Sequence, residues 1–187
     1  MILDRFNMEK FPEWLEIARN EGAIALVDKD RDWTSFDVVA KLRNMLKFKK
    51  AGHAGTLDPL ATGLLILGFG RGTKRMSEFQ NMPKEYHTVI RLGATTITYD
   101  TEAEEENFKD FDHLSDDEIE KAAGEFTGSI MQVPPEYSAK KVKGKRAYRE
   151  ARKNKPVELE PQQVEVHGIE ITDITLPFVT MTIKCSK

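Results

Sequence analysis

The sequence predicts a mixed fold of the α+β class, and two patterns support this prediction. Apolar residues recur at helical spacing in some segments and alternate with polar residues, as in strands, in others. Strand-like segments lie near both ends of the chain, and no repeat of fixed period occurs, which favours a sheet assembled from distant segments. With 187 residues, 40% of them hydrophobic, the chain can bury one ordinary core.

Helices are predicted where apolar residues share one face. Residues 1–22 are read as an N-terminal extension that holds a short amphipathic helix, with its apolar face formed by Phe11, Trp14, Leu15, Ile17 and Ala18. Thr34 or Ser35 caps a second helix, which is expected to bury Val38, Val39, Leu42, Met45 and Leu46. Ser115 and Glu118 form a capping box that opens a third, expected to bury Ile119, Ala122, Ala123 and Phe126.

Strands are predicted at residues 23–27, 64–69, 85–92, 164–174 and 178–184. The continuous apolar run at 64–69 suits a strand buried on both faces. The segment 85–92 alternates, with Tyr86, Thr88, Ile90 and Leu92 on one face, as in a half-buried strand. Residues 51–62 are predicted to be a loop between core elements.

Composition narrows the classes of protein. The longest apolar runs are far shorter than the roughly 20 residues of a membrane span, and the first residues lack the layout of a signal peptide, so we expect a soluble, cytoplasmic protein with no membrane partner. A single cysteine, Cys185, excludes an internal disulfide and a cysteine-rich zinc site.

Charge is segregated along the chain, although the net charge is only −3. Residues 100–120 hold eleven acids and one lysine, whereas residues 140–155 hold nine basic residues and one acid. A run of like charges, taken alone, is more often an ordinary solvated face, and nucleic-acid binding is the alternative for the basic run.

The loop from Ala51 to Gly63 is the most constrained in the sequence. It holds three glycines, and Pro59 restricts Asp58 to an extended conformation, so the loop is suited to holding one carboxylate in a fixed place. Considered alone, an Asp-Pro pair is more often a turn whose side chain caps local backbone N–H groups. A lone histidine such as His53 is likewise more often a hydrogen-bonded surface residue.

Residues 52–65, Gly-His-Ala-Gly-Thr-Leu-Asp-Pro-Leu-Ala-Thr-Gly-Leu-Leu, resemble the signature of the TruB family of pseudouridine synthases. Further blocks of resemblance lie on either side, in the family's order, at residues 26–29 and 33–39 before the loop and at residues 84–86, 92–100 and 132–152 after it. The resemblance implies a pseudouridine synthase fold, a mixed, largely antiparallel sheet flanked by helices. It makes residues 23–187 the catalytic domain, with a thumb-like segment at 132–155 that folds over RNA.

The resemblance also implies the chemistry. Asp58 would be the catalytic nucleophile that converts a uridine to pseudouridine, Tyr86 the aromatic that stacks on the flipped base, and His53 a substrate contact. Whether Asp58 adds to the sugar, adds to the base or removes a sugar proton stays open. The reaction involves no net redox change, so no cofactor and no metal are expected.

The partner implied is tRNA, with uridine 55 of the T-arm as the target, and no protein partner is inferred. Phosphate contacts are expected from basic residues, most of them in the thumb-like segment: Lys74, Lys140, Lys141, Lys143, Lys145, Arg146, Arg149 and Arg152. The glycine-rich segment 68–74 is not a Walker loop, since its threonine precedes its lysine.

Family members continue after a Cys-Ser-Lys triplet, here residues 185–187, with Gly-Thr-Tyr-Ile-Arg and later Asp-Leu-Gly. We therefore expect the C-terminal part of the catalytic domain to be absent from these residues, including the arginine that pairs with the catalytic carboxylate. This leaves a second hypothesis, a tRNA-binding module with weak or no catalysis. A glycosidase-like hydrolase is less favoured, because no convincing second carboxylate lies near the loop.

Overall fold

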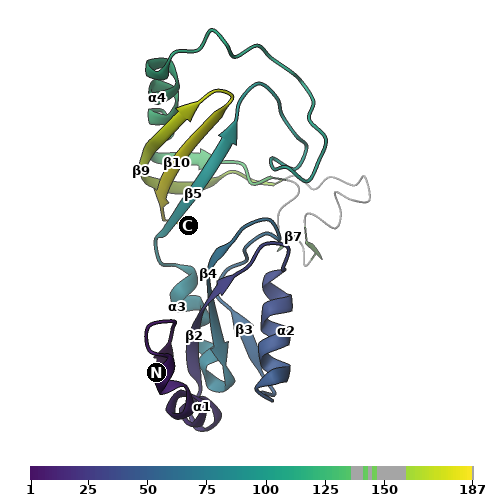
Figure 1. The fold of residues 1–187 in the computed structure, drawn as a ribbon, viewed down its shortest axis with the longest axis vertical. Coiled ribbons are helices and arrows are strands. Elements are labelled where there is room, and N and C mark those ends of the chain that lie inside the picture. Colours follow the sequence, from purple (N-terminus) through teal and green to yellow (C-terminus); the bar gives the residue numbers. More distant parts are fainter. Residues whose placement is uncertain (136–140, 143–144, 147–158, 187) are drawn as a thin grey trace. The chain divides into compact units, whose positions relative to one another are not determined.

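The structure is a computed structural model that describes residues 1–135, 141–142, 145–146 and 159–186. The chain divides into two compact units, Met1–Met82 and Pro83–Lys187, each with its own sheet (Figure 1). One sheet is mixed and the other antiparallel, which confirms the predicted α+β class. The boundary between the units falls inside the segment 23–187 that the sequence assigned to one catalytic domain, and that assignment stays a prediction.

The first unit is a four-stranded sheet with helices on both faces. Its strands run in the order β1 (Ile2–Leu3), β2 (Ala23–Lys29), β4 (Gly63–Phe69) and β3 (Ala51–His53). Only β1 and β2 are parallel among these pairs. The helical elements are η1 (Met8–Lys10), α1 (Phe11–Asn20), α2 (Ser35–Met45), η2 (Gly70–Arg75) and α3 (Met76–Gln80).

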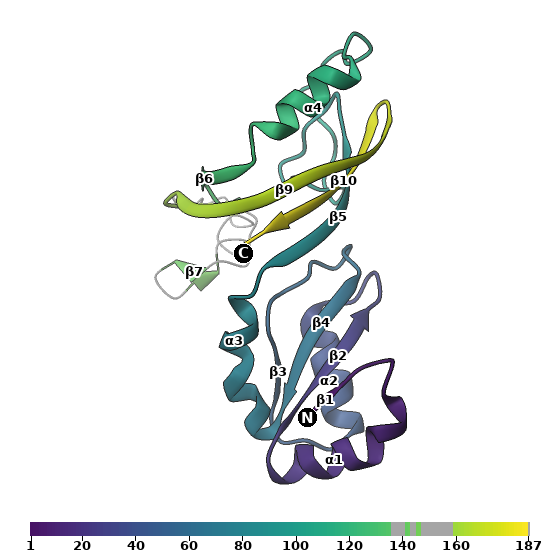
Figure 2. The ribbon, with the colours of Figure 1, turned by 90° about the vertical axis from the view of Figure 1, so that its left-hand side faces the viewer.

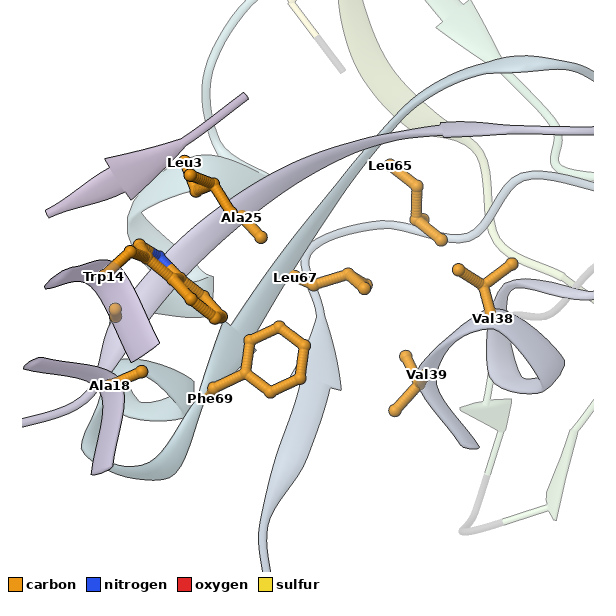
Figure 3. Packing of buried hydrophobic residues seen from close by; sticks show 10 residues of the cluster. Leu3, Trp14, Ala18, Ala25, Val38, Val39, Leu65, Leu67 and Phe69 are labelled. Atoms are coloured by element: carbon orange, nitrogen blue, oxygen red, sulfur yellow. The ribbon is translucent and has the colours of Figure 1, made fainter. Parts of the chain in front are cut away.

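Alternation along β2 and β4 determines which helices cover which face. Leu65, Leu67 and Phe69 of β4 pack with Trp14 and Ala18 of α1 and with Val38 and Val39 of α2 (Figure 3). The other face of the sheet places Ile24 against Met76 and Phe79 of α3. The strand predicted at 64–69 is therefore buried on both faces, as expected, except at its exposed first residue.

An aromatic group stabilises the end of this core. Trp14 is 1% exposed, and its Nε1 donates to the carbonyl oxygen of Ile24 at 2.8 Å, so its polar atom is satisfied although buried. Its ring meets that of Phe69 edge to face at a centroid distance of 5.4 Å and stacks on Phe11 at 6.0 Å. The predicted N-terminal helix thus forms part of the core of the first unit.

The second unit is an antiparallel sheet crossed on one face by a helix (Figure 2). Its strands run in the order β5 (Lys84–Arg91), β10 (Phe178–Cys185), β9 (Gln162–Thr175) and β6 (Gly128–Gln132), and the helix is α4 (Asp116–Gly124). The two-residue strands β7 (Lys141–Val142) and β8 (Lys145–Arg146) pair with each other. Across the described residues, no helix combines the length and apolarity that a bilayer crossing requires.

Several details of the predicted elements were wrong. No residue of α4 is buried, although Ile119, Ala122 and Ala123 were expected to be. Residues 51–53 were assigned to a loop but form β3, because they pair with residues 67–69 of β4. Met45, expected to be buried, is 62% exposed at the last residue of α2. Phe126 is 59% exposed, because α4 ends at Gly124 and the ring lies beyond the helix.

An apolar groove of about 550 Å³ lies between α4 and the sheet of the second unit. Ile90, on the predicted inner face of β5, lines this groove and is 42% exposed, so that face of the strand is not fully buried. The other strands contribute mainly aliphatic side chains, Ile130, Val164, Val166, Ile169, Val179, Met181 and Ile183.

Candidate active site

The loop that holds Asp58 runs along the edge of the first sheet. It leaves β3 at His53, which is in register with Leu67, and enters β4 at Gly63, which is in register with Lys29. Just after β3 the Ala54 N–H donates to the Ile66 carbonyl oxygen at 2.9 Å. At ~3.3 Å per residue, the positions of His53 and Gly63 are about 13 Å apart along the strand direction.

The backbone on either side of Asp58 is tied down by distant residues. Before it, the Leu57 N–H donates to Ser35 Oγ at 2.9 Å, and the same hydroxyl donates to the Leu57 carbonyl oxygen at 3.1 Å. After it, the Pro59 carbonyl oxygen accepts from the Asp32 N–H at 2.8 Å and from Lys29 Nζ at 3.2 Å. Asp58 therefore sits between two fixed points rather than in a free turn.

Lys29 is the less expected of these anchors, because its side chain is almost fully buried, with 1% of the residue exposed. Its ammonium donates to three carbonyl oxygens, those of Asp30 at 3.0 Å, Trp33 at 2.8 Å and Pro59 at 3.2 Å. A buried ammonium is tolerated when its donors are satisfied in this way. It joins the end of β2, the turn before α2 and the loop of Asp58.

The other anchor, Ser35, depends on how α2 begins. Thr34 caps the helix, since its Oγ accepts from the Asp37 N–H at 3.1 Å while the Asp37 carboxylate accepts from the Thr34 N–H at 3.0 Å. This capping box fixes Ser35 as the first helical residue, with its hydroxyl directed at Leu57. Hydrogen bonds from Thr34, first that from its hydroxyl, hold the pKa of Asp37 below its ordinary value.

The side chain of Asp58 is exposed. Within the described part of the chain, no hydrogen bond or ion pair engages its carboxylate, so it is not the turn-capping aspartate that an isolated Asp-Pro pair would suggest. Both carboxylate oxygens are available to a substrate. A fixed backbone with an unengaged carboxylate is the arrangement that a nucleophile requires.

His53 is half-buried, and its Nδ1 makes a short hydrogen bond with the Gly55 carbonyl oxygen. Because a carbonyl only accepts, this contact places the proton on Nδ1. In the neutral ring Nε2 then carries the lone pair and can accept from a hydroxyl or an amide of a ligand.

Tyr86 belongs to the second unit and lies on β5 in register with Ile183 of β10. The residue is 44% exposed, so part of it is accessible to a ligand. Alternation along β5 puts it on the same side of the sheet as Ile90, which lines the apolar groove.

The predicted phosphate-binding residues have different outcomes. Lys74 lies in η2 of the first unit and is exposed. Lys141, Lys145 and Arg146 lie in the short strands β7 and β8, where only the backbone is described. The remaining four lie outside the described residues: Lys140, Lys143, Arg149 and Arg152.

The sequence of this chain matches a known protein family. The model of the N-terminal domain of the TruB family of pseudouridylate synthases matches residues 43–187, which include Asp58, His53 and Tyr86. This chain belongs to the TruB family of pseudouridylate synthases. The predicted family is thereby confirmed, and with it the class of enzyme, an isomerase that makes pseudouridine.

Relatives of the TruB family resemble the chain over most of its length. A protein of Chlorobaculum tepidum is 47% identical over 178 residues, which cover 92% of this chain and 74% of the relative. One of Chlorobium chlorochromatii is 46% identical and covered to 67%, and one of Parabacteroides distasonis is 43% identical and covered to 73%. All three are named tRNA pseudouridine synthase B.

Solved structures confirm the fold. A chain of a Cbf5-Nop10-Gar1 complex superposes with a TM-score of 0.63 at 25% identity and covers 91% of this chain. A chain of an H/ACA RNP bound to a substrate RNA containing 2'-deoxyuridine gives a TM-score of 0.62 at 23% identity. The chain spans only 41% and 39% of these two solved chains, respectively.

Sequence reasoning located the TruB signature loop but missed the residues that hold it. Lys29 had no role in the sequence analysis, and Ser35 was considered only as a possible helix cap. A lysine after a strand is usually solvated, and a serine at a helix start usually serves the helix itself. Among the described residues, no cluster of three or more His, Cys, Asp or Glu side chains could hold a metal ion.

Proposed function

We propose that this chain converts uridine 55 in the T-arm of tRNA to pseudouridine, with Asp58 as the nucleophile. The observation that carries the proposal is the exposed Asp58 carboxylate between backbone groups fixed by Ser35 and Lys29. The names of the curated relatives support tRNA as the substrate.

The chemistry needs one anionic group near the sugar. The N1–C1′ bond of the uridine breaks, the freed uracil turns, and a C5–C1′ bond forms. N1 takes up a proton and C5 loses one, so no external group is consumed and no redox change occurs. A carboxylate is ionised at neutral pH and can act on the electron-poor centre.

The remaining residues serve binding. A base inside a folded RNA arm must be extruded, which costs a few kcal/mol and is offset by stacking and by contacts to the displaced strand. Tyr86, a residue that is 44% exposed, supplies the aromatic ring for stacking. His53, with Nε2 free to accept in the neutral ring, contacts the substrate, and the basic residues of 140–152 and Lys74 contact phosphates.

We predict that Asp58→Asn abolishes turnover and leaves RNA affinity within a few-fold, because the substitution removes the nucleophilic charge and keeps the shape. Tritium release from a T-arm stem-loop labelled at C5 of uridine 55 measures turnover, and fluorescence anisotropy measures affinity. Asp112→Asn is the matched control, since it removes an exposed carboxylate from the second unit and is expected to leave both quantities unchanged.

Near-normal release by Asp58→Asn would contradict the role of Asp58. RNA binding without any release by the unaltered chain would instead favour a tRNA-binding module. Release from a stem-loop labelled at another uridine, with none from uridine 55, would contradict the T-arm target while leaving the reaction intact.

A further inference from the structure

The first unit contains a hollow that is lined by basic side chains. Its volume is about 350 Å³, and four of its eight lining residues are basic while none is acidic. We call it the cationic pocket, and its lining residues are Arg19, Asn20, Gly22, Lys50, Gly70, Arg71, Thr73 and Lys74. Only Lys74 among them was a candidate from the sequence.

The backbone beneath this pocket is closely packed, so the four cations are brought together by the fold. A Cβ on Gly22, whose φ is +88°, would lie 2.3 Å from the Gly72 nitrogen, and one on Gly72 would lie 2.4 Å from the Ala23 carbonyl oxygen. Glycine at both positions lets the end of α1 and the turn into η2 meet backbone to backbone. The Gly70 N–H donates to the Lys50 carbonyl oxygen at 2.9 Å, which ties in a third segment.

The positive charge of the pocket is not neutralised by the protein. None of the four basic side chains forms an ion pair with another described residue, whereas the adjacent Arg75 does so with Glu78 at 3.0 Å. Like charges held close together repel, and a bound anion removes that cost. Two guanidinium groups also offer paired N–H donors that fit phosphate oxygens.

The lining identifies the part of the ligand that enters. It contains no aromatic or large apolar side chain that would hold a base or an organic group. The pocket lies at the Phe69 end of β4. Pro59, next to Asp58, is held by Lys29, which is in register with Gly63 at the other end of the strand, about 20 Å away at ~3.3 Å per residue. A contact at that distance positions a ligand and takes no part in bond breaking.

We propose that the cationic pocket binds a phosphate of the RNA backbone, away from the substrate uridine, through Arg19, Lys50, Arg71 and Lys74. This inference rests on the proposed function, because it takes the RNA as its ligand. It adds Arg19, Lys50 and Arg71 to the RNA-binding residues and extends the RNA footprint across the first unit.

The double variant Arg19→Gln/Arg71→Gln tests the proposal. Both side chains are exposed, and glutamine keeps their stems, so the fold should be retained, which circular dichroism checks. We expect weaker binding to the T-arm stem-loop and a log–log salt slope shallower by about 0.7–0.9, the value of one phosphate contact. The control Lys10→Gln/Lys121→Gln removes the same charge from exposed positions outside any site, and its slope should equal that of the unaltered chain.

A slope equal to that of the control would overturn the proposal, and tritium release would show whether the proposed function survives it. Absence of RNA binding by the unaltered chain would contradict the proposed function and exclude RNA as the ligand of the pocket. A titration of the 15N-labelled chain with inorganic phosphate separates the two sources of phosphate. Shifts of the Gly70 and Gly72 amides with inorganic phosphate but not with RNA would mark a free-anion site and overturn the RNA assignment.

Discussion

Lys29 lies where three backbone segments of the first unit converge. Its ammonium donates to the backbone carbonyl oxygens of residues 30, 33 and 59, and none of these three acceptors is a carboxylate. Asp32, between the first two, has a φ of 66° and directs its N–H at the Pro59 carbonyl oxygen as well. Left-handed backbone is more accessible to aspartate than to most residues, which suits this tight turn. We infer that Lys29 is a positioning residue for Asp58.

We predict that Lys29→Met lowers the single-turnover rate by up to about 10²-fold, because a displacement of about 1 Å at the reacting group is enough for that loss. Methionine fills a similar volume but leaves carbonyl oxygens without their donor, which should cost about 1–3 kcal/mol in the free energy of unfolding. Rapid-quench measurement of product and urea denaturation give the two values.

The salt-dependent affinity for RNA separates positioning from simple loss of fold. It should be unchanged in Lys29→Met at temperatures where the variant is folded, since Lys29 is buried. Lys10→Met, at an exposed lysine, is the matched control. A normal single-turnover rate in folded Lys29→Met would show that the loop holds its place without the ammonium.

Residue chemistry and tertiary contact differ in how far they can be predicted. The loop of Asp58 was noticed for local features, the proline after Asp58 and the glycines around it, and the role of Asp58 came from the resemblance of residues 52–65 to the TruB signature. Lys29 and Ser35 reach the same loop across 30 and 22 residues of sequence. Periodicity and spacing describe neighbours within a segment, so neither contact could be derived from them. The partner of Tyr86 on β10 was hidden for the same reason, since Ile183 is 97 positions away.

Two helices begin with a capping box, in which a hydroxyl and a carboxylate are three residues apart. Thr34 and Asp37 open α2, and Ser115 and Glu118 open α4. The pKa of Asp37 is lowered chiefly by the Thr34 hydroxyl, and that of Glu118 chiefly by the Ser115 backbone N–H. A lowered pKa means that the stabilising contribution is complete above the ordinary carboxyl range and is lost as the pH falls through the folded-state value.

We predict that Thr34→Ala and Ser115→Ala each destabilise the chain by about 1 kcal/mol at neutral pH, the usual cost of losing such a cap. Only Thr34→Ala should also slow turnover, because Ser35 at the start of α2 holds the loop of Asp58. Urea denaturation as a function of pH measures stability, and tritium release measures turnover. The destabilisation should shrink at acid pH, where the carboxylates are protonated. Equal turnover in both variants would contradict a link between the cap of α2 and the active site.

Elements with local signals were predictable and short ones were not. The capping box of α4 was visible in the sequence, whereas for α2 the sequence offered Thr34 or Ser35 as the cap and only the structure shows that Thr34 caps the helix in a box with Asp37. The strand β3 has three residues and no alternation, and it exists because β4 offers it a partner. The extent of α4 was overestimated, since apolar spacing continues to Phe126 while the helix ends at Gly124.

The two units bury their apolar residues to different degrees. In the first, ten buried residues form one cluster that joins α1, α2 and the sheet. In the second, an apolar groove lies between the sheet and α4, and side chains expected to be internal, such as Ile90, remain partly exposed. Periodicity told which face of β5 is apolar. It could not tell what covers that face, because covering is a property of the whole fold.

This difference predicts unequal local stability. Amides that open only with the packed cluster should exchange more slowly than amides beside an exposed groove, because opening must expose buried apolar surface. We therefore expect the amides of residues 65–67 in β4 to exchange at least about tenfold more slowly than those of residues 129–131 in β6, a difference of about 1.4 kcal/mol. Hydrogen–deuterium exchange followed by NMR measures both sets. Leu67→Ala, at a residue 0% exposed, should lower the protection of β4 by about 2–5 kcal/mol or down to its unfolding limit. Protection in β6 equal to that in β4 of the unaltered chain would mean that the groove is closed in solution, and the inference from its exposed lining would be wrong.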